Sequence, residues 1–132
     1  MAHWVPYNAN PAGNRNIDCT VRAISVALGQ SWHQTYAEFF VKGFIAKMMP
    51  ETNVVWRNYL RRKGFGRATI PDTCPDCYTV GDFADEHPTG VYVLGTGDHA
   101  VAVVSGNVID TFDSRGMPAL YYYYRKEDTP HE

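Results

Sequence analysis

The stretch HAVAVVSGNVID, residues 99–110, decides the fold of this chain. Two apolar segments, residues 99–104 and 107–112, predict a β-hairpin whose tight turn is Ser105-Gly106 or Gly106-Asn107. Ser105-Gly106 suits a two-residue turn. A two-residue turn pairs position 104 with 107, 101 with 110 and 99 with 112. Because side chains alternate between the two faces of a strand, His99 and Asp110 then share a face and lie diagonally beside each other. A three-residue loop would shift the pairing by one position and place Asp113, rather than Asp110, on the face of His99.

Around this hairpin the sequence predicts helices first and strands last. An irregular lead-in of 17 residues precedes three helices, which are expected from Asp18 to Gly29, from Ser31 onward and over about residues 53–63. Residues 66–78 are expected to form a loop, and a short helix follows between Thr79 and Pro88. Strands at 90–94 and 119–124 join those of the hairpin. This segregation predicts an α+β fold, with N-terminal helices packed on a C-terminal antiparallel sheet, in one domain over residues 1–132.

The composition is that of a globular protein. Of the 132 residues, 45% are hydrophobic and 20% are charged, which excludes the disordered and fibrous classes. Three cysteines are too few for a disulfide framework, so we expect a reducing compartment and a cytoplasmic location. The apolar runs are too short for a membrane span, and the first residues lack the pattern of a signal peptide.

The net charge of −2 conceals an asymmetry between the two halves of the chain. Residues 1–67 contain nine Lys and Arg against three Asp and Glu, whereas residues 68–132 contain three against eleven. Either the two halves attract each other across their contact, or a basic face meets an acidic partner. We expect the active cleft to follow the boundary between the helical half and the sheet half.

Three residues form a candidate site. Cys19 stands in the first turn of the first helix, where the positive end of the helix stabilises a thiolate, the reactive form of cysteine. His99, at the start of a strand, can supply the base that a thiol nucleophile needs, and Asp110 can orient its ring. The alternatives are a buried small hydrophobe at Cys19 and a structural histidine at His99.

Three other motifs compete for a function. Cys74-Pro75-Asp76-Cys77 is half of a zinc site, a redox pair or a plain loop, and no second CxxC is present. The basic stretch 57–67 has the composition of a phosphate-binding segment, but its cations also suit the C-terminal end of a helix, so nucleic-acid binding is not expected. The run Tyr121–Tyr124 should alternate across a strand, which leaves half of its rings exposed or against a partner and makes a homodimer an alternative.

The segments 18–24 and 99–111 resemble small papain-like cysteine peptidases of the kind encoded by bacteriophages and prophages. The spacing between Cys19 and His99 is also similar to that of the bacteriocin-processing peptidase domains. The resemblance implies a papain-like fold in which Cys19 is the nucleophile, His99 the general base and acid, and Asp110 the orienting residue. Papain relatives carry an oxyanion-stabilising Gln six residues before the cysteine, where this chain has Gly13. Asn14, or less favourably Asn16, is then the expected oxyanion donor, together with the Cys19 backbone N–H.

From these residues and this resemblance we expect a cysteine hydrolase that cleaves a peptide, isopeptide or related amide bond through a thioester, without a metal or cofactor. Its partner would be a protein or peptide substrate, and its location the host cytoplasm if a phage encodes it. Arg22, one turn after Cys19, forms either a structural salt bridge or a substrate contact. The alternative function is a non-catalytic binding protein on the papain scaffold, such as a phage factor that inhibits a host protein.

Overall fold

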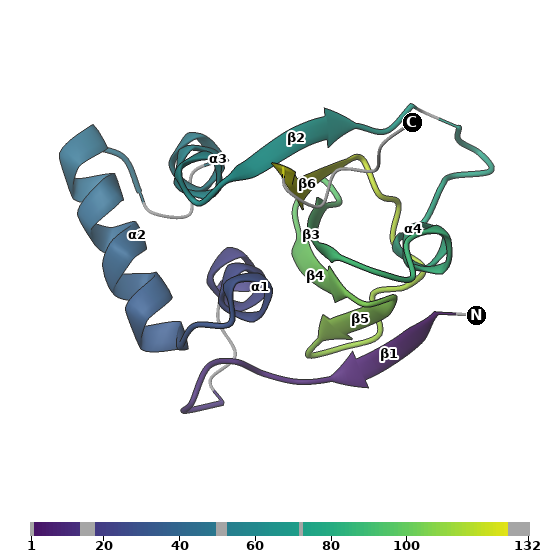
Figure 1. Ribbon diagram of the computed structural model, residues 1–132, viewed down its shortest axis with the longest axis horizontal. Helices are drawn as coiled ribbons and strands as arrows, with labels where there is room; N and C mark the ends of the chain where they lie inside the picture. Colours follow the sequence, from purple (N-terminus) through teal and green to yellow (C-terminus); the bar gives the residue numbers. More distant parts are fainter. Residues whose placement is uncertain (1, 14–17, 50–52, 72, 127–132) are drawn as a thin grey trace.

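A computed structural model describes residues 2–13, 18–49, 53–71 and 73–126 of the chain (Figure 1). In this part, four helices and six strands form a mixed α+β structure. The elements in chain order are β1 (His3–Pro6), α1 (Cys19–Leu28), α2 (Trp32–Ala46), α3 (Asn53–Arg62), β2 (Phe65–Thr69), α4 (Val80–Glu86), β3 (Val91–Gly95), β4 (Ala100–Val104), β5 (Asn107–Asp110) and β6 (Tyr121–Arg125). None of the helices described is long and apolar enough to cross a membrane.

The helix ends follow the local sequence. Gly29 ends α1 in the left-handed conformation, with φ 65°, as its position predicts. The Ser31 hydroxyl accepts a hydrogen bond from the Gln34 N–H at 3.1 Å and begins α2, and Thr79 begins α4 with a complete capping box. Asp18 occupies the cap position of α1, but its carboxylate makes no capping bond. The helix begins directly after Asp18 as expected, but Arg22 and other groups bind the Asp18 carboxylate, so it does not cap the free N–H groups of the helix.

The predicted hairpin is confirmed in its register. β4 pairs with β5 so that Val104 lies opposite Asn107 and Val103 opposite Val108, which is the pairing expected of a two-residue turn. Ser105 and Gly106 form that turn with φ angles of 52° and 77°, the positive values that a type I′ turn requires. This register places Asp110, and not Asp113, beside His99.

Two strands form where the sequence predicts irregular structure. β1 lies in the lead-in and pairs in parallel with β5, and β2 occupies the start of the expected loop. The sheet order is β1-β5-β4-β3-β6-β2, so the sheet is mixed and includes N-terminal residues, whereas a C-terminal antiparallel sheet was expected. Both strands are edge strands of four or five residues, and their pairing partners lie far away in the sequence, so short-range patterns do not reveal them.

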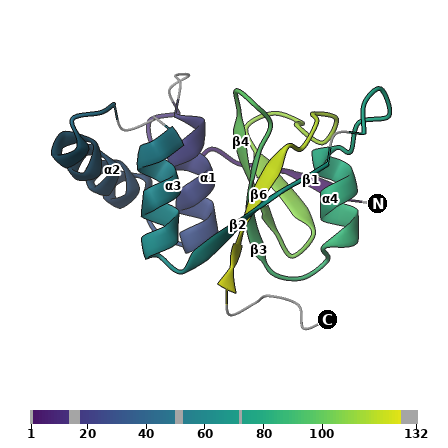
Figure 2. The same ribbon diagram turned by 90° about the horizontal axis from the view of Figure 1, so that it is seen from above.

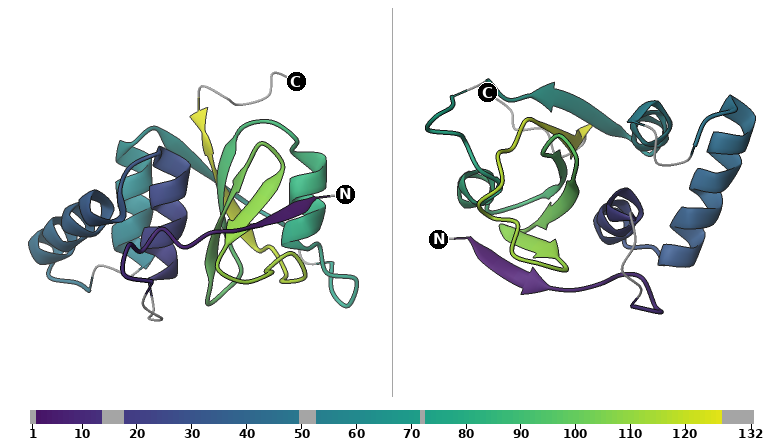
Figure 3. Two further views of the ribbon diagram at one scale, coloured as in Figure 1. Left: turned by 90° about the horizontal axis from the view of Figure 1, so that it is seen from below. Right: turned by 180° about the vertical axis from the view of Figure 1, so that it is seen from behind.

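The sheet is covered on both faces, as Figure 2 and Figure 3 show, with α1 to α3 on one side and α4 on the other. The first core contains Ile24, Phe39 and Trp56 from the helices, packed against Val93 and Ala102 of the sheet. The second lies under α4 and contains Val80, Phe83, Leu94, Val101, Val103 and Val108. Burial on both faces explains why β3 and β4 are continuously apolar.

The tyrosine strand β6 is an interior strand, between β3 and β2. Tyr121 and Tyr123 pack against Trp56 of α3, and Tyr122 packs against Phe83 of α4. None of the four tyrosines falls in the exposed class. The expectation that half of them face solvent or a partner is wrong, because helices cover both faces and both edges of β6 are paired. Homodimerisation through this strand loses its basis.

Candidate active site

The structure brings Cys19, His99 and Asp110 together at one end of the sheet. Cys19 begins α1, His99 precedes β4, and Asp110 ends β5. The His99 ring hydrogen-bonds the Cys19 side chain, and its Nε2 atom lies 2.6 Å from Asp110 Oδ2. Because Nε2 faces the carboxylate, Nδ1 is the ring nitrogen left for the thiol. The three side chains form a continuous chain of hydrogen bonds, with the order nucleophile, base and orienting acid.

Asp110 is held rigidly by its neighbours. Its Oδ2 atom also accepts a hydrogen bond from the Ser114 hydroxyl at 2.8 Å, and its Oδ1 atom accepts one from the Thr111 N–H at 2.7 Å. The strand β1 adds backbone support, since the Tyr7 N–H donates to the Asp110 carbonyl oxygen at 3.0 Å. Asp113, in contrast, is exposed and pairs with Arg115. The fixed carboxylate can therefore set the orientation of the His99 ring.

The surroundings favour a charged pair of Cys19 and His99. Burial raises the pKa of Cys19, but the hydrogen bonds from His99 and the Ala100 N–H, with the charges of His99 and Arg22, outweigh it and lower that pKa below its ordinary value. Burial lowers the pKa of His99, yet the bonds to Asp110 and Cys19 outweigh this and raise it to about 9. Both shifts favour the thiolate–imidazolium form of the pair over the neutral thiol and imidazole.

A second ion pair supports the start of α1. The guanidinium of Arg22 binds the Asp18 carboxylate one turn earlier, and its Nη2 atom lies 3.9 Å from Asp110 Oδ1. Asp18 is buried and also accepts hydrogen bonds from the Trp32 indole N–H at 2.9 Å and from the Asn10 amide at 3.3 Å. Arg22 thus connects the nucleophile helix to the acid that orients His99. This is the structural salt bridge expected for Arg22, and it places a positive charge close to the thiol.

The other side of the site is formed by Tyr121. Tyr121 of β6 pairs with Gly95 of β3, and Gly95 pairs on its other side with Ala100 of β4. The Ala100 N–H is the backbone donor to Cys19. A side chain on Gly95 would collide with the Tyr121 ring, since a Cβ atom there would lie 2.1 Å from the ring. The Tyr121 ring therefore lies over a glycine whose strand, β3, pairs with β4, the strand that follows His99. The guanidinium of Arg67 lies over the Tyr121 ring, 4.4 Å from its centre.

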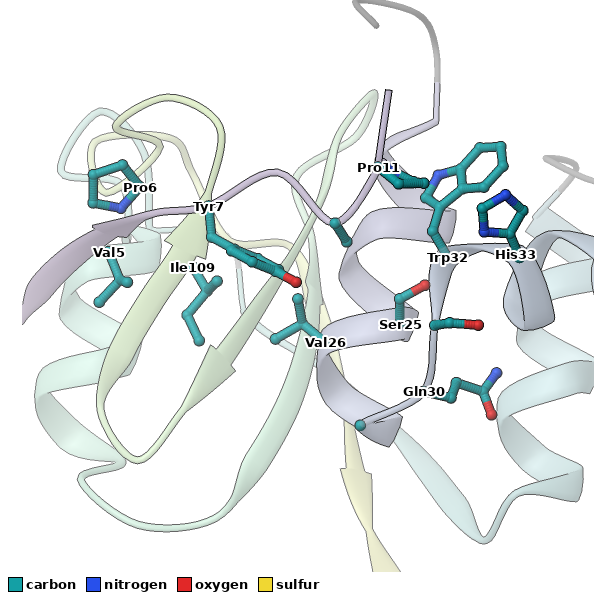
Figure 4. Close-up of a pocket in the computed structure, with 13 residues that line it drawn as sticks. Val5, Pro6, Tyr7, Pro11, Ser25, Val26, Gln30, Trp32, His33 and Ile109 are labelled. Carbon is teal, nitrogen blue, oxygen red and sulfur yellow. The ribbon is translucent and has the colours of Figure 1, made fainter. Parts of the chain in front are cut away.

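A cavity of about 590 Å³ lies between β1, β5 and α1 (Figure 4). In Figure 4, Tyr7 extends between Ile109 of β5 and Val26 of α1, while Gln30 and Trp32 line the helical side. These three residues, Tyr7, Val26 and Ile109, also line a small hollow that contains Cys19 and Asp110. The cavity therefore adjoins the candidate site and lies between the helical and the sheet halves.

The expected oxyanion donors lie outside the described residues. Asn14 is the first choice and Asn16 the second, and both belong to the stretch 14–17. The Cys19 backbone N–H remains a candidate, because the first N–H groups of a helix have no partner within the helix.

The Cys74-Pro75-Asp76-Cys77 motif contains a disulfide between its two cysteines, so Cys19 is the free thiol in the described part of the chain. This bond closes a local loop and is not a disulfide framework, and of the alternatives for this motif it matches the pairing of a redox pair. Among the described residues, no three His, Cys, Asp or Glu side chains are grouped as a metal site would need.

Sequence reasoning missed the residues that hold the site in place. Ser114 stands four residues after Asp110, in a polar turn whose composition gives a weak local signal. Tyr7 and Trp32 reach the site through tertiary pairing alone, and nothing near them in the sequence indicates it.

Comparison of the chain with protein-family models, with curated proteins and with solved structures gives no match.

Proposed function

We propose that this protein is a cysteine hydrolase of papain-like fold that cleaves a peptide, isopeptide or related amide bond. The observation that supports this proposal best is the hydrogen-bonded chain of Cys19, His99 and Asp110, with the cysteine at the start of a helix. Cys19 belongs to a helix, and His99 directly precedes β4 of the sheet on which this helix packs. This placement agrees with the papain-like arrangement that the motifs resemble.

In the proposed reaction, the Cys19 sulfur attacks the carbonyl carbon and forms a C–S bond, while the negative charge moves to the carbonyl oxygen. The Cys19 N–H then stabilises this oxyanion. As the tetrahedral intermediate collapses, the C–N bond breaks and His99 gives its proton to the leaving amine, which leaves a thioester and a neutral imidazole.

The second half of the reaction releases the acyl group. Neutral His99 takes a proton from water, whose oxygen attacks the thioester carbon. The C–S bond breaks, the acid departs, and the thiolate–imidazolium pair is restored. Asp110 keeps Nε2 of His99 engaged at 2.6 Å throughout, so that Nδ1 faces the sulfur in both steps.

The proposal is tested with a library of fluorogenic peptide amides and three proteins: wild type, Cys19→Ser and His99→Ala. We expect release of the fluorescent amine by the wild type, a loss of about 10²–10⁴-fold in His99→Ala, and loss of turnover in Cys19→Ser. A peptide fluoromethyl ketone should label Cys19 in the wild type alone. If no amide is cleaved and the ketone leaves Cys19 unlabelled, the non-catalytic alternative replaces this proposal. A binder should keep its partner after Cys19→Ala.

A further inference from the structure

The outer face of α2 is apolar and uncovered. Phe44 is 76% and Ile45 is 68% exposed, and the exposed large hydrophobic residues on and just beyond this helix are Tyr36, Phe40, Val41, Phe44, Ile45, Met48 and Met49. Positions 40, 41, 44 and 45 recur at helical spacing and form one face of α2, and Met48 and Met49 follow just after the helix ends. A surface helix normally points its apolar residues inward, so this arrangement is the reverse of the usual one.

The inner contact of α2 is correspondingly narrow. Only Thr35, Phe39 and Gly43 of this helix are buried, and they follow one another at intervals of four residues on the side opposite the apolar face. The core of the domain therefore does not use the outer residues. Their hydrophobic character has no role in the fold as described and requires another explanation.

A groove continues this face toward α3. It has a volume of about 460 Å³ and is lined by Ala37, Glu38, Val41, Lys42, Tyr59, Arg62 and Lys63. Glu38 is already engaged, because it accepts a hydrogen bond from the Tyr59 hydroxyl and lies 3.5 Å from the Lys63 amine. Lys42 and Arg62 have no carboxylate partner among the described residues. The groove thus has an apolar floor and an excess of positive charge along its rim.

We propose that the α2–α3 groove and the outer face of α2 bind an amphipathic helix of a partner protein, with the apolar side of that helix on Phe44 and Ile45 and acidic residues along its edges. A groove between two helices suits a third helix, and apolar anchors at helical spacing are the usual basis of such recognition. The cations Lys42 and Arg62 require negative charge on the partner. This inference goes beyond the proposed hydrolase and does not depend on it.

A second copy of the chain fits this surface less well. Two copies that meet through α2 would bring their Lys42 and Arg62 side chains toward each other, which like charges oppose. The basic half of one copy could instead meet the acidic half of another, but such a contact uses two different surfaces and leads to rings or open fibres. It also does not require the apolar face of α2. A flat lipid surface would leave the groove between α2 and α3 unfilled.

The test uses two fluorescein-labelled peptides of about 18 residues, each with leucines at positions i, i+3, i+4 and i+7 of a helix. One peptide carries glutamates on its remaining face, and the other carries lysines there. Fluorescence anisotropy should show that the acidic peptide binds at least about tenfold more tightly than the basic one. The double variant Phe44→Ser/Ile45→Ser should weaken binding of the acidic peptide by about tenfold, whereas Leu120→Ser, at an exposed leucine whose backbone bonds Gly95 and Ile70 and not α2, should not.

Charge reversal gives the decisive comparison. The double variant Lys42→Glu/Arg62→Glu should lose the acidic peptide and gain affinity for the basic one. Unchanged alkylation of Cys19 in each variant shows that the fold is retained. Equal binding of both peptides would overturn the proposal. So would sedimentation that shows self-association of the wild type abolished by Phe44→Ser, or binding to anionic vesicles in the absence of peptide binding, since these results assign the face to a second copy or to a membrane.

Discussion

Replacement of His99 by alanine should slow the alkylation of Cys19 and move its pH dependence upward. The change removes both the hydrogen bond and the positive charge that lower the pKa of Cys19, while the burial that raises this pKa remains. The Ala100 N–H, Arg22 and the start of α1 would still favour the thiolate. The rate of the variant should therefore rise at a higher pH than that of the wild type.

The size of the effect follows from the ionised fraction. A cysteine with the ordinary pKa of about 8.5 is roughly 3% thiolate at pH 7, so complete ionisation supplies about 30-fold more nucleophile. A thiolate of lower pKa is intrinsically less reactive, and with a Brønsted coefficient of about 0.5 the net advantage at pH 7 over an ordinary cysteine is at most roughly threefold. We therefore expect a loss of about 3-fold to 10-fold at pH 7, toward the upper end because burial raises the pKa of Cys19 in the variant.

The assay is alkylation by iodoacetamide between pH 5 and pH 10, followed by intact-protein mass spectrometry and mapping of the modified residue. His3→Ala is a matched control, since His3 is exposed on β1. Coincident rate profiles for the wild type and His99→Ala would refute the inference that His99 activates Cys19. Because Cys74 and Cys77 form a disulfide, the modified residue should be Cys19.

Three further predictions concern the acid, the core and the pH dependence of folding. Asp110→Asn should lower the pKa of His99 from about 9, as followed by NMR titration of the ring, whereas Asp113→Asn should leave it unchanged because Asp113 is exposed and pairs with Arg115. Phe39→Ala should reduce the free energy of unfolding by about 3–5 kcal/mol in a urea titration, while the exposed neighbour Phe40→Ala should change it little. Because the pKa of His99 is higher in the folded state than its ordinary 6.5, its contribution to stability is complete below that value and is lost as the pH rises through about 9. The melting temperature of the wild type should thus fall between pH 7 and pH 10, and the part of that fall that His99 causes should be absent from His99→Ala.

Much of the candidate site could be predicted because its geometry is local. Ser105-Gly106 sets a two-residue turn, and that turn fixes which strand positions face each other. The alternation of a strand then places Asp110 beside His99 without further information. Cys19 could be placed at a helix start in the same way, from the apolar spacing after it and from Gly29 at the other end.

The supporting residues could not be predicted, since they depend on contacts between distant segments. β1 reaches the site by parallel pairing with β5, about a hundred residues later in the chain. Asp18 reads as a helix cap in the sequence, yet its carboxylate is taken by Arg22 and Trp32. A carboxylate next to a helix start can accept hydrogen bonds either from the free N–H groups of the helix or from neighbouring side chains. Only the packed structure shows which donors it binds.

The sequence by itself therefore determined the helices, the hairpin with its register, and the juxtaposition of His99 and Asp110, because each of these depends on interactions over a few residues. Tertiary structure alone decided that Cys19 meets this pair and that the sheet gains its edge strands β1 and β2. It also decided that the four tyrosines of β6 are covered while Phe44 and Ile45 of α2 are not. Burial depends on which surfaces meet in the folded chain, and the same apolar pattern can serve a core or a binding surface.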